Sequence, residues 1–326
     1  MTSLREAVRD AVLVLSASGI HSAEHDAVAL AACALKTTSG EVRKRMIIGA
    51  PVPPGFEDLV AERARRVPLQ HLTGKAGFRR LELSVGPGVF VPRFETELVA
   101  GLAIAHLLTI FHQANPPEPG KPTDGAGDGA ANLAGWRGAV PGSGGAGPTP
   151  SPGLRRVVVD LCAGSGAIAL AIKDEVPAAE VHGVELSELA HAWAIRNRDD
   201  LGLDVDIRLG DASLAFPELE SGVDVVVSNP PYIPAGAIPT DPEVRDHDPE
   251  VALYGGSPDG LRIPFEVAAR AAVLLRPGGL FVMEHADTQG DSAQTGLAST
   301  GRWLDIEDHE DLNGRPRAVT AVRSAR

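Results

Sequence analysis

The fold is decided by the stretch Arg155-Arg-Val-Val-Val-Asp-Leu-Cys-Ala-Gly-Ser-Gly166. Its apolar run has the length of a buried strand, and the glycines let the chain turn into a helix from Gly166. Further strands are predicted at 180–186, 205–209, 223–228 and 279–284, with helices from Ser187 and over 263–275. This alternation predicts a doubly wound, largely parallel α/β sheet of the Rossmann type, completed by an antiparallel pair at 303–308 and 318–323.

The residues before this sheet have the hydrophobic periodicity of helices. Ser3 and Glu6 form a capping-box pattern, Ser22 opens an alanine-rich helix, and residues 54–67 read as another helix. Residues 1–74 are therefore assigned to a small helical domain. Alternating apolar residues then predict a β-hairpin in a connector at 75–93, with strands at 81–85 and 89–91 around a turn at 86–88.

The rest of the chain, residues 94–326, forms the sheet domain, and one segment interrupts it. Phe94-Glu-Thr-Glu97 leads into a helix that continues through Leu108. Residues 114–153 lose all periodicity and are rich in glycine, proline and alanine. Such a segment cannot bury enough apolar surface to offset its loss of conformational entropy, so a flexible insertion is predicted there.

Composition narrows the classes of function. The chain has 326 residues and a formal net charge of -13, which favours a protein or small-molecule substrate over long nucleic acid. The longest continuous apolar runs are strand-sized, and the N-terminus lacks a signal-peptide pattern. The two cysteines, Cys33 and Cys162, have no metal-ligand spacing. We expect a cytoplasmic protein with no membrane segment, no metal site and no disulfide framework.

The glycines after the first sheet strand mark a ligand site. Between Asp160 and Gly166 they let the backbone approach a ligand, and the helix N-terminus offers free N–H groups. Glu185 ends the next strand about twenty residues later, where an acid binds ribose hydroxyls. Gly164-Ser-Gly-Ala-Ile-Ala169 also fits a dinucleotide fingerprint, so a nicotinamide-dependent oxidoreductase is an alternative.

Acidic residues near this loop favour a different cofactor. Asp160 would repel a pyrophosphate and attract the ammonium and sulfonium groups of S-adenosylmethionine. Its alternative role is to cap the following turn. Asp211 follows the third strand, with Ala212 beside it, and is placed to receive an adenine amino group, although it also fits a solvated turn residue.

The chemistry is carried by Asn229-Pro-Pro-Tyr232, which follows the strand at 223–228 at the sheet edge where ligands bind. An amide or aromatic amine nitrogen is a poor nucleophile because its lone pair is delocalised. The Asn229 side-chain oxygen and the Pro230 carbonyl can hold its two N–H protons and direct the lone pair at a methyl group. Tyr232 offers a flat face for stacking. An ordinary proline-rich turn is the alternative, disfavoured by the glycine loop upstream.

Together these pieces resemble the HemK/PrmC family, the peptide chain release factor glutamine N(5)-methyltransferases. The resemblance runs from about Arg63 to Arg323, outside the insertion. It rests on the segments 66–74, 90–97, 160–168, 227–233, 248–256, 259–261 and 311–317. Asn-Pro-Pro-Tyr is shared with methyltransferases of nucleic-acid bases, whereas Pro92-Arg-Phe-Glu-Thr-Glu97 and the segment 311–317 are more specific. The sequence departs from the family in the long insertion and at Cys162, where glycine is common.

The resemblance implies a class I methyltransferase that modifies the glutamine of a Gly-Gly-Gln motif with S-adenosylmethionine as cofactor. It assigns Asn229, Pro230, Pro231 and Tyr232 to catalysis and substrate binding. To the cofactor it assigns Cys162, Ala163, Gly164, Ser165, Gly166, Glu185, Ala212 and Asn229, beside the Asp160 and Asp211 singled out above. Arg93 binds a cofactor carboxylate or the substrate backbone, or else forms an ion pair with Glu95 or Glu97.

The expected partner is a release factor, which the helical domain contacts in the family. We expect a monomer that makes no direct contact with nucleic acid. Two related activities remain as alternatives: methylation of a ribosomal-protein glutamine and methylation of a nucleic-acid base. A catalytically inactive binding protein is disfavoured because the Asn229–Tyr232 motif is intact.

Overall fold

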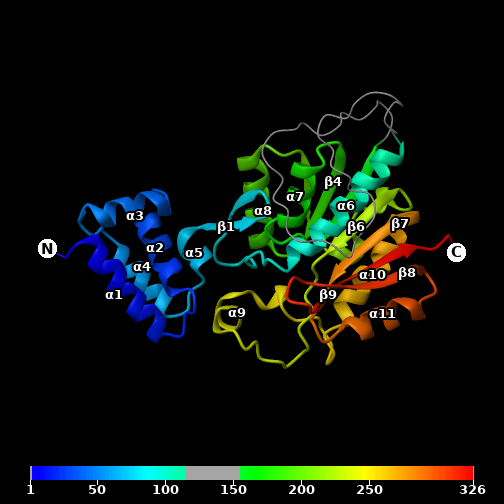
Figure 1. The fold of residues 1–326 in the computed structure, drawn as a ribbon. Coiled ribbons are helices and arrows are strands. Elements are labelled where there is room, and N and C mark those ends of the chain that lie inside the picture. Colours follow the sequence, from blue (N-terminus) through cyan, green and yellow to red (C-terminus); the bar gives the residue numbers. More distant parts are fainter. Residues whose placement is uncertain (1, 115–154, 326) are drawn as a thin grey trace.

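The computed structural model describes residues 2–114 and 155–325. A helical unit at the N-terminus is followed by a two-stranded hairpin and then by a seven-stranded sheet covered with helices (Figure 1). The predicted α/β sheet with a helical N-terminal domain is thereby confirmed. The insertion predicted at 114–153 lies outside the described residues, apart from Ala114. The domain boundaries themselves remain a prediction.

The N-terminal unit has its own apolar core. Its first helix begins as predicted, because Ser3 Oγ accepts the Glu6 amide at 3.3 Å and Glu6 Oε2 accepts the Ser3 amide at 2.9 Å. Leu15, Leu30 and Phe56 are fully buried between the helices. The five helices are α1 (Leu4–Ala17), α2 (Ala23–Ala34), α3 (Ser39–Ile47), α4 (Phe56–Ala64) and α5 (Leu69–Thr73).

The hairpin lies one strand earlier than predicted. β1 (Lys75–Phe78) pairs antiparallel with β2 (Leu81–Ser84), so its turn is at residues 79–80 and not at 86–88. The strand predicted at 89–91 is wrong, since Val89 and Val91 are buried against α8 (Glu188–Leu201) without pairing. An alternating apolar pattern reports burial, which a loop packed on a helix produces as well as a strand does.

Seven strands form one mixed sheet in the order β5-β4-β3-β6-β7-β9-β8. The first five in that order are parallel, and β9 is antiparallel to both of its neighbours. β3 has β4 on one side and β6 on the other, and ligands of open α/β sheets bind where the strand order reverses in this way. The strands are β3 (Arg156–Leu161), β4 (Ala179–Glu185), β5 (Val205–Leu209), β6 (Val223–Ser228), β7 (Leu275–Glu284), β8 (Trp303–Glu310) and β9 (Pro316–Arg323).

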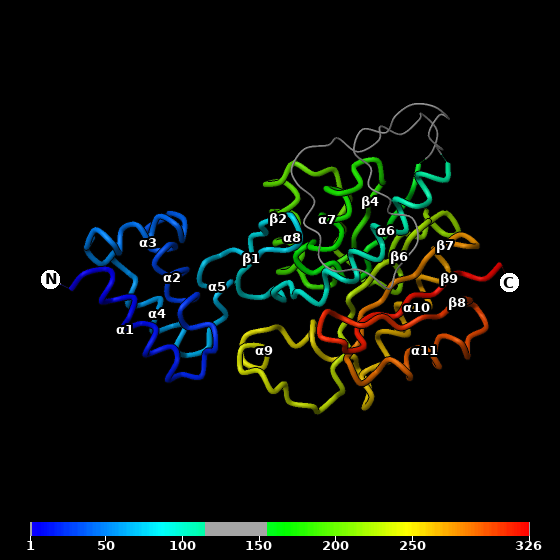
Figure 2. Tube along the Cα trace, viewed as in Figure 1, coloured from blue at the N-terminus to red at the C-terminus, as the bar shows by residue number. Residues whose placement is uncertain are grey.

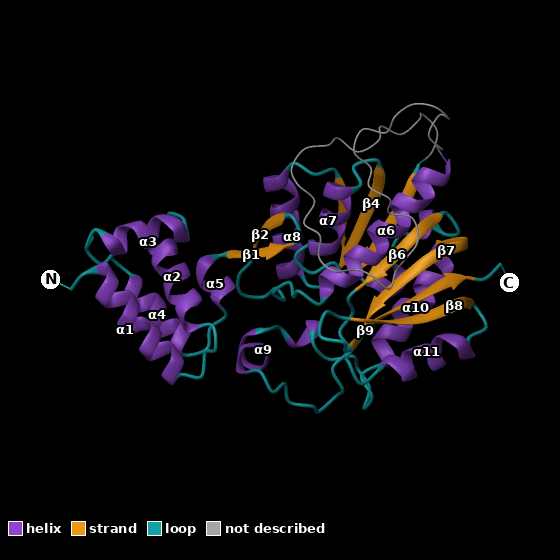
Figure 3. Ribbon diagram, in the orientation of Figure 1, coloured by secondary structure: helices purple, strands orange, loops and turns teal. Residues whose placement is uncertain are grey.

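Each face of the sheet carries an apolar core, as the alternation along β6 shows. Val225 and Val227 join one core, and Val226 joins the other. Helices cover both faces (Figure 3). α6 (Thr96–Ala114), α7 (Ala167–Glu175) and α8 pack into the first core, while α10 (Arg262–Leu274) and α11 (Gly290–Ser299) pack into the second.

Helix α6 is long and apolar enough, by length and composition, to cross a membrane. The expectation that apolar segments stay strand-sized therefore needs correction, because this helix spreads its apolar residues over 19 positions with single polar residues between them. Val99, Ala103 and Leu107 are fully buried and pack into the core of the sheet. Of its most apolar stretch 33% is buried, so the helix is partly buried against the sheet.

A long connecting segment, residues 229–261, leads from β6 to α10 and is called the excursion below. It includes α9 (Pro242–His247). Figure 2 shows α9 between the helical unit and the sheet. Arg63 of α4 forms an ion pair with Glu243 at 2.8 Å, which ties the excursion to the helical unit. Short 3-10 turns occur at Ala212–Leu214, Pro217–Leu219 and Glu250–Ala252.

Candidate active site

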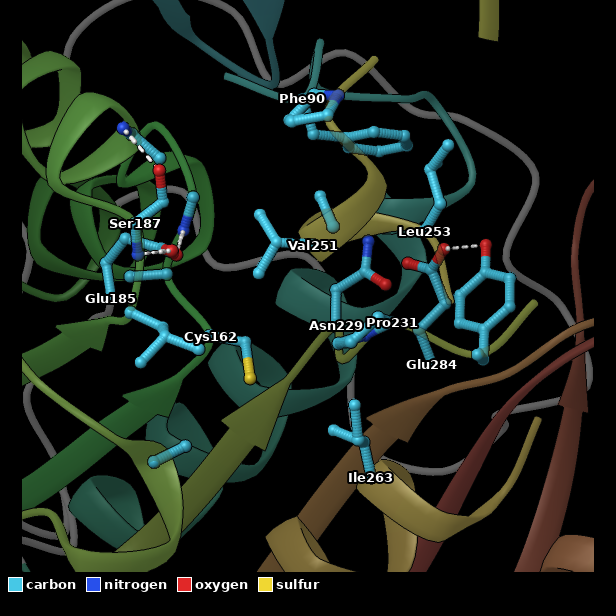
Figure 4. Close-up of a pocket in the computed structure, with 18 of the residues that line it drawn as sticks. Phe90, Cys162, Glu185, Ser187, Asn229, Pro231, Val251, Leu253, Ile263 and Glu284 are labelled. Atoms are coloured by element: carbon cyan, nitrogen blue, oxygen red, sulfur yellow. Dashed lines mark hydrogen bonds between the residues drawn. The ribbon is translucent and has the colours of Figure 1, made fainter. Parts of the chain in front are cut away.

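A cleft of about 640 Å³ opens at the carboxyl ends of β3, β4 and β6. Figure 4 shows Cys162, Glu185 and Ser187 on one side of it and Asn229, Pro231 and Glu284 on the other. Residues of the excursion and of the loop after the hairpin complete the wall, among them Phe90, Val251 and Leu253. The volume lies in the range of sites for nucleoside-sized ligands.

The glycine loop forms one wall of the cleft. Gly164 and Gly166 have φ angles of 58° and 83°, in the left-handed region that favours glycine. Gly166 is the N-cap of α7, so unpaired amides of the first helical turn face the loop. Cys162, Ala163 and Ser165 also line the cleft. The predicted loop residues therefore all belong to the loop that borders the cleft.

Cys162 adopts a φ angle of 71°. A side chain at this angle is strained, which explains in physical terms why glycine suits the position. Burial and the nearby Glu185 raise the pKa of the thiol well above its usual range. The thiol therefore stays protonated at neutral pH, which disfavours its reaction as a nucleophile.

Glu185 is fixed in place by the backbone around it. Its Oε2 accepts the Gly164 amide at 2.7 Å and its Oε1 accepts the Ser187 amide at 2.8 Å (Figure 4). Burial raises the pKa of this carboxyl, and these backbone hydrogen bonds oppose the rise. The residue lines the cleft at the end of β4, where a carboxylate can accept two ribose hydroxyls.

Asp160 lies behind the loop and does not line the cleft. It is fully buried, and its Oδ2 accepts the Ala169 amide at 3.1 Å, within the first turns of α7. Its Oδ1 has no hydrogen-bond partner among the described residues. Burial raises the pKa of Asp160 to about 7. Any effect on a cationic ligand is therefore exerted through its field or through the loop backbone.

Asp211 and Ala212 line the same end of the cleft. One carboxylate oxygen of Asp211 accepts the Ser213 amide at 2.8 Å and the Ser213 hydroxyl at 2.7 Å. Asp211 thus caps the turn at Ala212–Leu214, and its side chain is exposed at the cleft. Both roles considered for it are compatible with this position.

The Asn229–Tyr232 motif forms the opposite wall. Asn229 Nδ2 donates to Thr96 Oγ1 at 3.1 Å, and among the described residues no hydrogen bond reaches its Oδ1, which can therefore accept from a ligand. The Tyr232 hydroxyl donates to Glu284 Oε1 at 3.1 Å. Both prolines are buried, and Pro231 lines the cleft whereas Pro230 does not. A rigid motif with one free amide acceptor is what orientation of a weak nucleophile requires.

Arg93 lines the cleft, but its ion-pair partner differs from both that were predicted. Its Nη2 donates to Asp248 Oδ2 at 2.8 Å, and its guanidinium lies over the Phe90 ring at 5.0 Å. The expected pairing with Glu95 or Glu97 is wrong, because Asp248 reaches Arg93 from the excursion, 155 residues further along the chain.

The sequence assigned no role to several supporting residues, although Gly260 lies in the segment 259–261 that resembles the family. Gln289 Nε2 donates to the Tyr232 carbonyl at 2.9 Å and so fixes the backbone of the motif. A Cβ at Gly260 would lie 2.1 Å from that same carbonyl oxygen, so only glycine fits there. Asn197 of α8 donates to the Ser165 carbonyl at 3.0 Å and so supports the glycine loop. Each contact joins distant segments, which no local pattern encodes.

The lining residues fit S-adenosylmethionine better than a dinucleotide. Near the glycine loop the charged lining groups are the carboxylates of Glu185 and Asp211, and the basic residues of the cleft come from other elements. A pyrophosphate would be repelled at this end, whereas ammonium and sulfonium groups would be attracted. Among residues 2–114 and 155–325, no group of three or more His, Cys, Asp or Glu side chains could hold a metal.

Two family models match the chain: the PrmC N-terminal domain over residues 6–74 and the methyltransferase small domain over residues 149–241. The release factor glutamine methyltransferase of Streptomyces coelicolor is 43% identical over 99% of both chains. The chain belongs to this family. It is therefore an S-adenosylmethionine-dependent methyltransferase, and the resemblance found in its motifs is confirmed.

Two further relatives show which activities are named for similar proteins. The release factor glutamine methyltransferase of Mycolicibacterium smegmatis is 40% identical over the full length of both chains. A 4-amino-L-phenylalanine/4-methylamino-L-phenylalanine methyltransferase of Streptomyces pristinaespiralis is 35% identical over 99% of this chain and 96% of its own. The same architecture thus occurs in proteins named for different nitrogen substrates.

Proposed function

We propose that this enzyme methylates the side-chain amide nitrogen of the glutamine in the Gly-Gly-Gln motif of peptide chain release factors. The observation that carries the proposal is the Asn229 amide at the cleft. Its Nδ2 donates to Thr96, so its Oδ1 is left to accept a hydrogen bond from a substrate NH2 group. Full-length similarity to release factor glutamine methyltransferases supports the choice of substrate.

In this proposal the cofactor lies against one wall of the cleft and the substrate amide against the opposite wall. Glu185, Asp211 and the loop at 162–166 would hold S-adenosylmethionine, which supplies an electrophilic methyl group when bound. Asn229 Oδ1 and the Pro230 carbonyl would accept hydrogen bonds from the two N–H groups of the substrate amide. The nitrogen lone pair is then directed toward the cofactor wall. Once the nitrogen carries the methyl group it is strongly acidic and loses one of its two protons to solvent water, so no strong base is needed.

The aromatic and apolar lining would exclude water from the reacting nitrogen. Tyr232 and Phe90 border the cleft together with Val251 and Leu253. Burial raises the pKa of the Tyr232 hydroxyl well above its usual range, so it stays neutral and keeps donating to Glu284. A planar amide held against these side chains loses rotational freedom before transfer, which lowers the entropic part of the barrier.

The substrate is a folded protein in this proposal, and the helical unit is placed to receive it. α4 is joined by an ion pair to the excursion that lines the cleft. A surface running from the helical unit to the cleft could contact a release factor on both sides of its glutamine loop. A cytoplasmic location, where release factors act, agrees with the two free cysteines.

The test is methyl transfer from labelled S-adenosylmethionine into purified release factor, followed by sequencing of the modified peptide. We expect label on the glutamine of Gly-Gly-Gln and none in a release factor in which this glutamine is replaced by glutamate. Parallel reactions contain ribosomal proteins, ribosomal RNA or 4-amino-L-phenylalanine. Faster transfer to any of these than to the release factor would overturn the proposal.

A further inference from the structure

Glu284 is a buried carboxyl group of the cleft to which the proposed reaction assigns no role. It ends β7 and is 2% exposed, yet it lines the cleft. The Tyr232 hydroxyl donates to its Oε1 at 3.1 Å, whereas its Oε2 has no hydrogen-bond partner among the described residues. A buried polar atom without a partner costs stability, so its presence indicates a role in binding or chemistry.

The pairing of β6 with β7 places this carboxyl group next to Asn229. Ser228 and Met283 are partners in the parallel register, so Asn229 and Glu284 follow them at neighbouring strand ends. Adjacent strands lie about 5 Å apart. Figure 4 shows both side chains on the same wall of the cleft, with the Glu284 carboxyl group beside the Asn229 amide. A substrate nitrogen bound by Asn229 is therefore close to Glu284.

The charges around Glu284 do not cancel its own. Arg317 lines the cleft and acts on the Glu284 carboxyl through its charge, but no ion pair joins these two side chains among the described residues. The Arg317 guanidinium pairs instead with Asp311 at 3.5 Å. Glu95 is a second carboxylate of the cleft lining whose charge acts on Glu284. The substrate nitrogen would therefore meet a net negative charge.

Methyl transfer moves a positive charge onto this nitrogen. The nitrogen lone pair forms a bond to the methyl carbon, the carbon–sulfur bond breaks, and its electron pair stays on sulfur. The positive charge of the sulfonium thus appears on the nitrogen, which afterwards loses a proton to solvent water. We propose that the Glu284 carboxylate stabilises this developing charge and disfavours a substrate carboxylate in place of the amide. This inference rests on the proposed function. A fixed charge in a water-excluded site acts on the transition state without reorganisation.

The first test is kinetic and compares two carboxylates. Glu284→Gln keeps the shape of the side chain and an acceptor for Tyr232 but removes the charge. Burial raises the pKa of Glu284 to about 7, so single-turnover methylation of a release factor is measured at about pH 8, where the carboxylate predominates. We expect transfer to slow by about ten- to a hundredfold, less than the loss of a donor in direct contact because Arg317 offsets part of the charge. Glu266→Gln removes an exposed carboxylate that pairs with Arg262, and its rate should stay within about twofold of wild type.

The second test measures binding and needs no transfer. Calorimetry with the demethylated cofactor compares a release factor that has its glutamine with one that has glutamate in its place. Wild type should prefer glutamine, and Glu284→Gln should narrow this preference by about threefold or more, because the repulsion between two carboxylates is gone. Glu284→Asp keeps the charge and should keep the preference. The preference is a ratio within one variant, so a partial loss of stability does not alter it.

Two results would overturn the role of Glu284: a Glu284→Gln rate within about threefold of wild type, or a preference for glutamine that Glu284→Gln leaves unchanged. Lack of transfer to the release factor by the wild-type enzyme would instead contradict the proposed function.

Discussion

Arg63 of the helical unit donates to Glu243 of the excursion across 2.8 Å, and the two side chains are 5% and 15% exposed. The same guanidinium also donates through Nε to Asp26 at 2.8 Å. One buried cation thus holds a carboxylate of its own domain and another from the segment that lines the cleft. The helical unit is therefore joined to the active site by desolvated ion pairs as well as by the chain.

Replacing Arg63 should destabilise the protein strongly. Arg63→Met leaves Asp26, which is 1% exposed, without its cation, and a buried charge that loses its partner typically costs about 3–5 kcal/mol. Urea unfolding should show a loss of this order. Arg9→Met removes an ion pair that is exposed, and it should change stability by less than about 1 kcal/mol. Similar small effects of both changes would show that the Arg63 cluster is not a structural link.

The strain at Cys162 predicts a difference between two small substitutions. Cys162→Gly and Cys162→Ala both remove the thiol, but only glycine is comfortable at a φ of 71°. Relief of strain of about 1–2 kcal/mol is partly offset by the greater freedom of glycine in the unfolded chain. Cys162→Gly should therefore be about 0.5–1 kcal/mol more stable than Cys162→Ala in urea unfolding. A more stable alanine variant would mean that the loop relaxes without strain.

Glu185 should matter for cofactor affinity. Glu185→Ala removes the acceptor of the Gly164 and Ser187 amides and the carboxylate that we propose binds the ribose hydroxyls. Binding of S-adenosylmethionine should weaken by about 1–3 kcal/mol, the usual scale for losing such a partner in a buried site. Isothermal calorimetry measures it, with the exposed Glu188→Ala as the control. Unchanged affinity in Glu185→Ala would place the ribose elsewhere.

Raised carboxyl pKa values predict how stability changes with pH. Burial raises the pKa of Asp160 and of Glu284 to about 7 and that of Asp248 to about 6. At these three carboxyls the native state holds more protons than the unfolded chain between about pH 4 and 7, so their contribution to stability should fall as pH rises through this window. Burial lowers the pKa of His71, His106, His182 and His309, and these groups act in the opposite direction. Asp160→Asn should flatten the fall, and the exposed Asp10→Asn should not. Equal slopes for all three proteins in urea unfolding from pH 5 to 8 would contradict this.

Most of the sheet was predictable because its signals are local. The glycine loop up to Gly166, the acid Glu185 and the motif from Asn229 each mark the end of a strand. A largely parallel sheet with its ligand site at that edge could therefore be inferred. The hairpin was misplaced because Lys75-Ala-Gly-Phe78 has weak strand propensity, while the apolar residues after it are buried in a loop.

The supporting contacts of the site were not predictable from the sequence. Thr96 reaches Asn229 across 133 residues, Gln289 reaches Tyr232 across 57, and Asp248 reaches Arg93 across 155. Such pairs form only when the fold brings distant segments together. Thr96 and Asp248 lie in segments that resemble the family, but the sequence does not say which residues they contact. The sequence therefore predicts which residues meet the ligand, and the structure shows what holds them.

The most direct measurement is single-turnover methylation of a release factor by Asn229→Ala at saturating cofactor. If the Asn229 oxygen orients the substrate nitrogen, its removal takes away a contact that acts in the transition state, and we expect turnover to fall by about 10²–10³. The melting temperature should stay close to that of wild type, and cofactor affinity should fall less than turnover does. A rate within a few-fold of wild type would contradict the role of Asn229, and the acceptor of the methyl group would then lie elsewhere in the cleft.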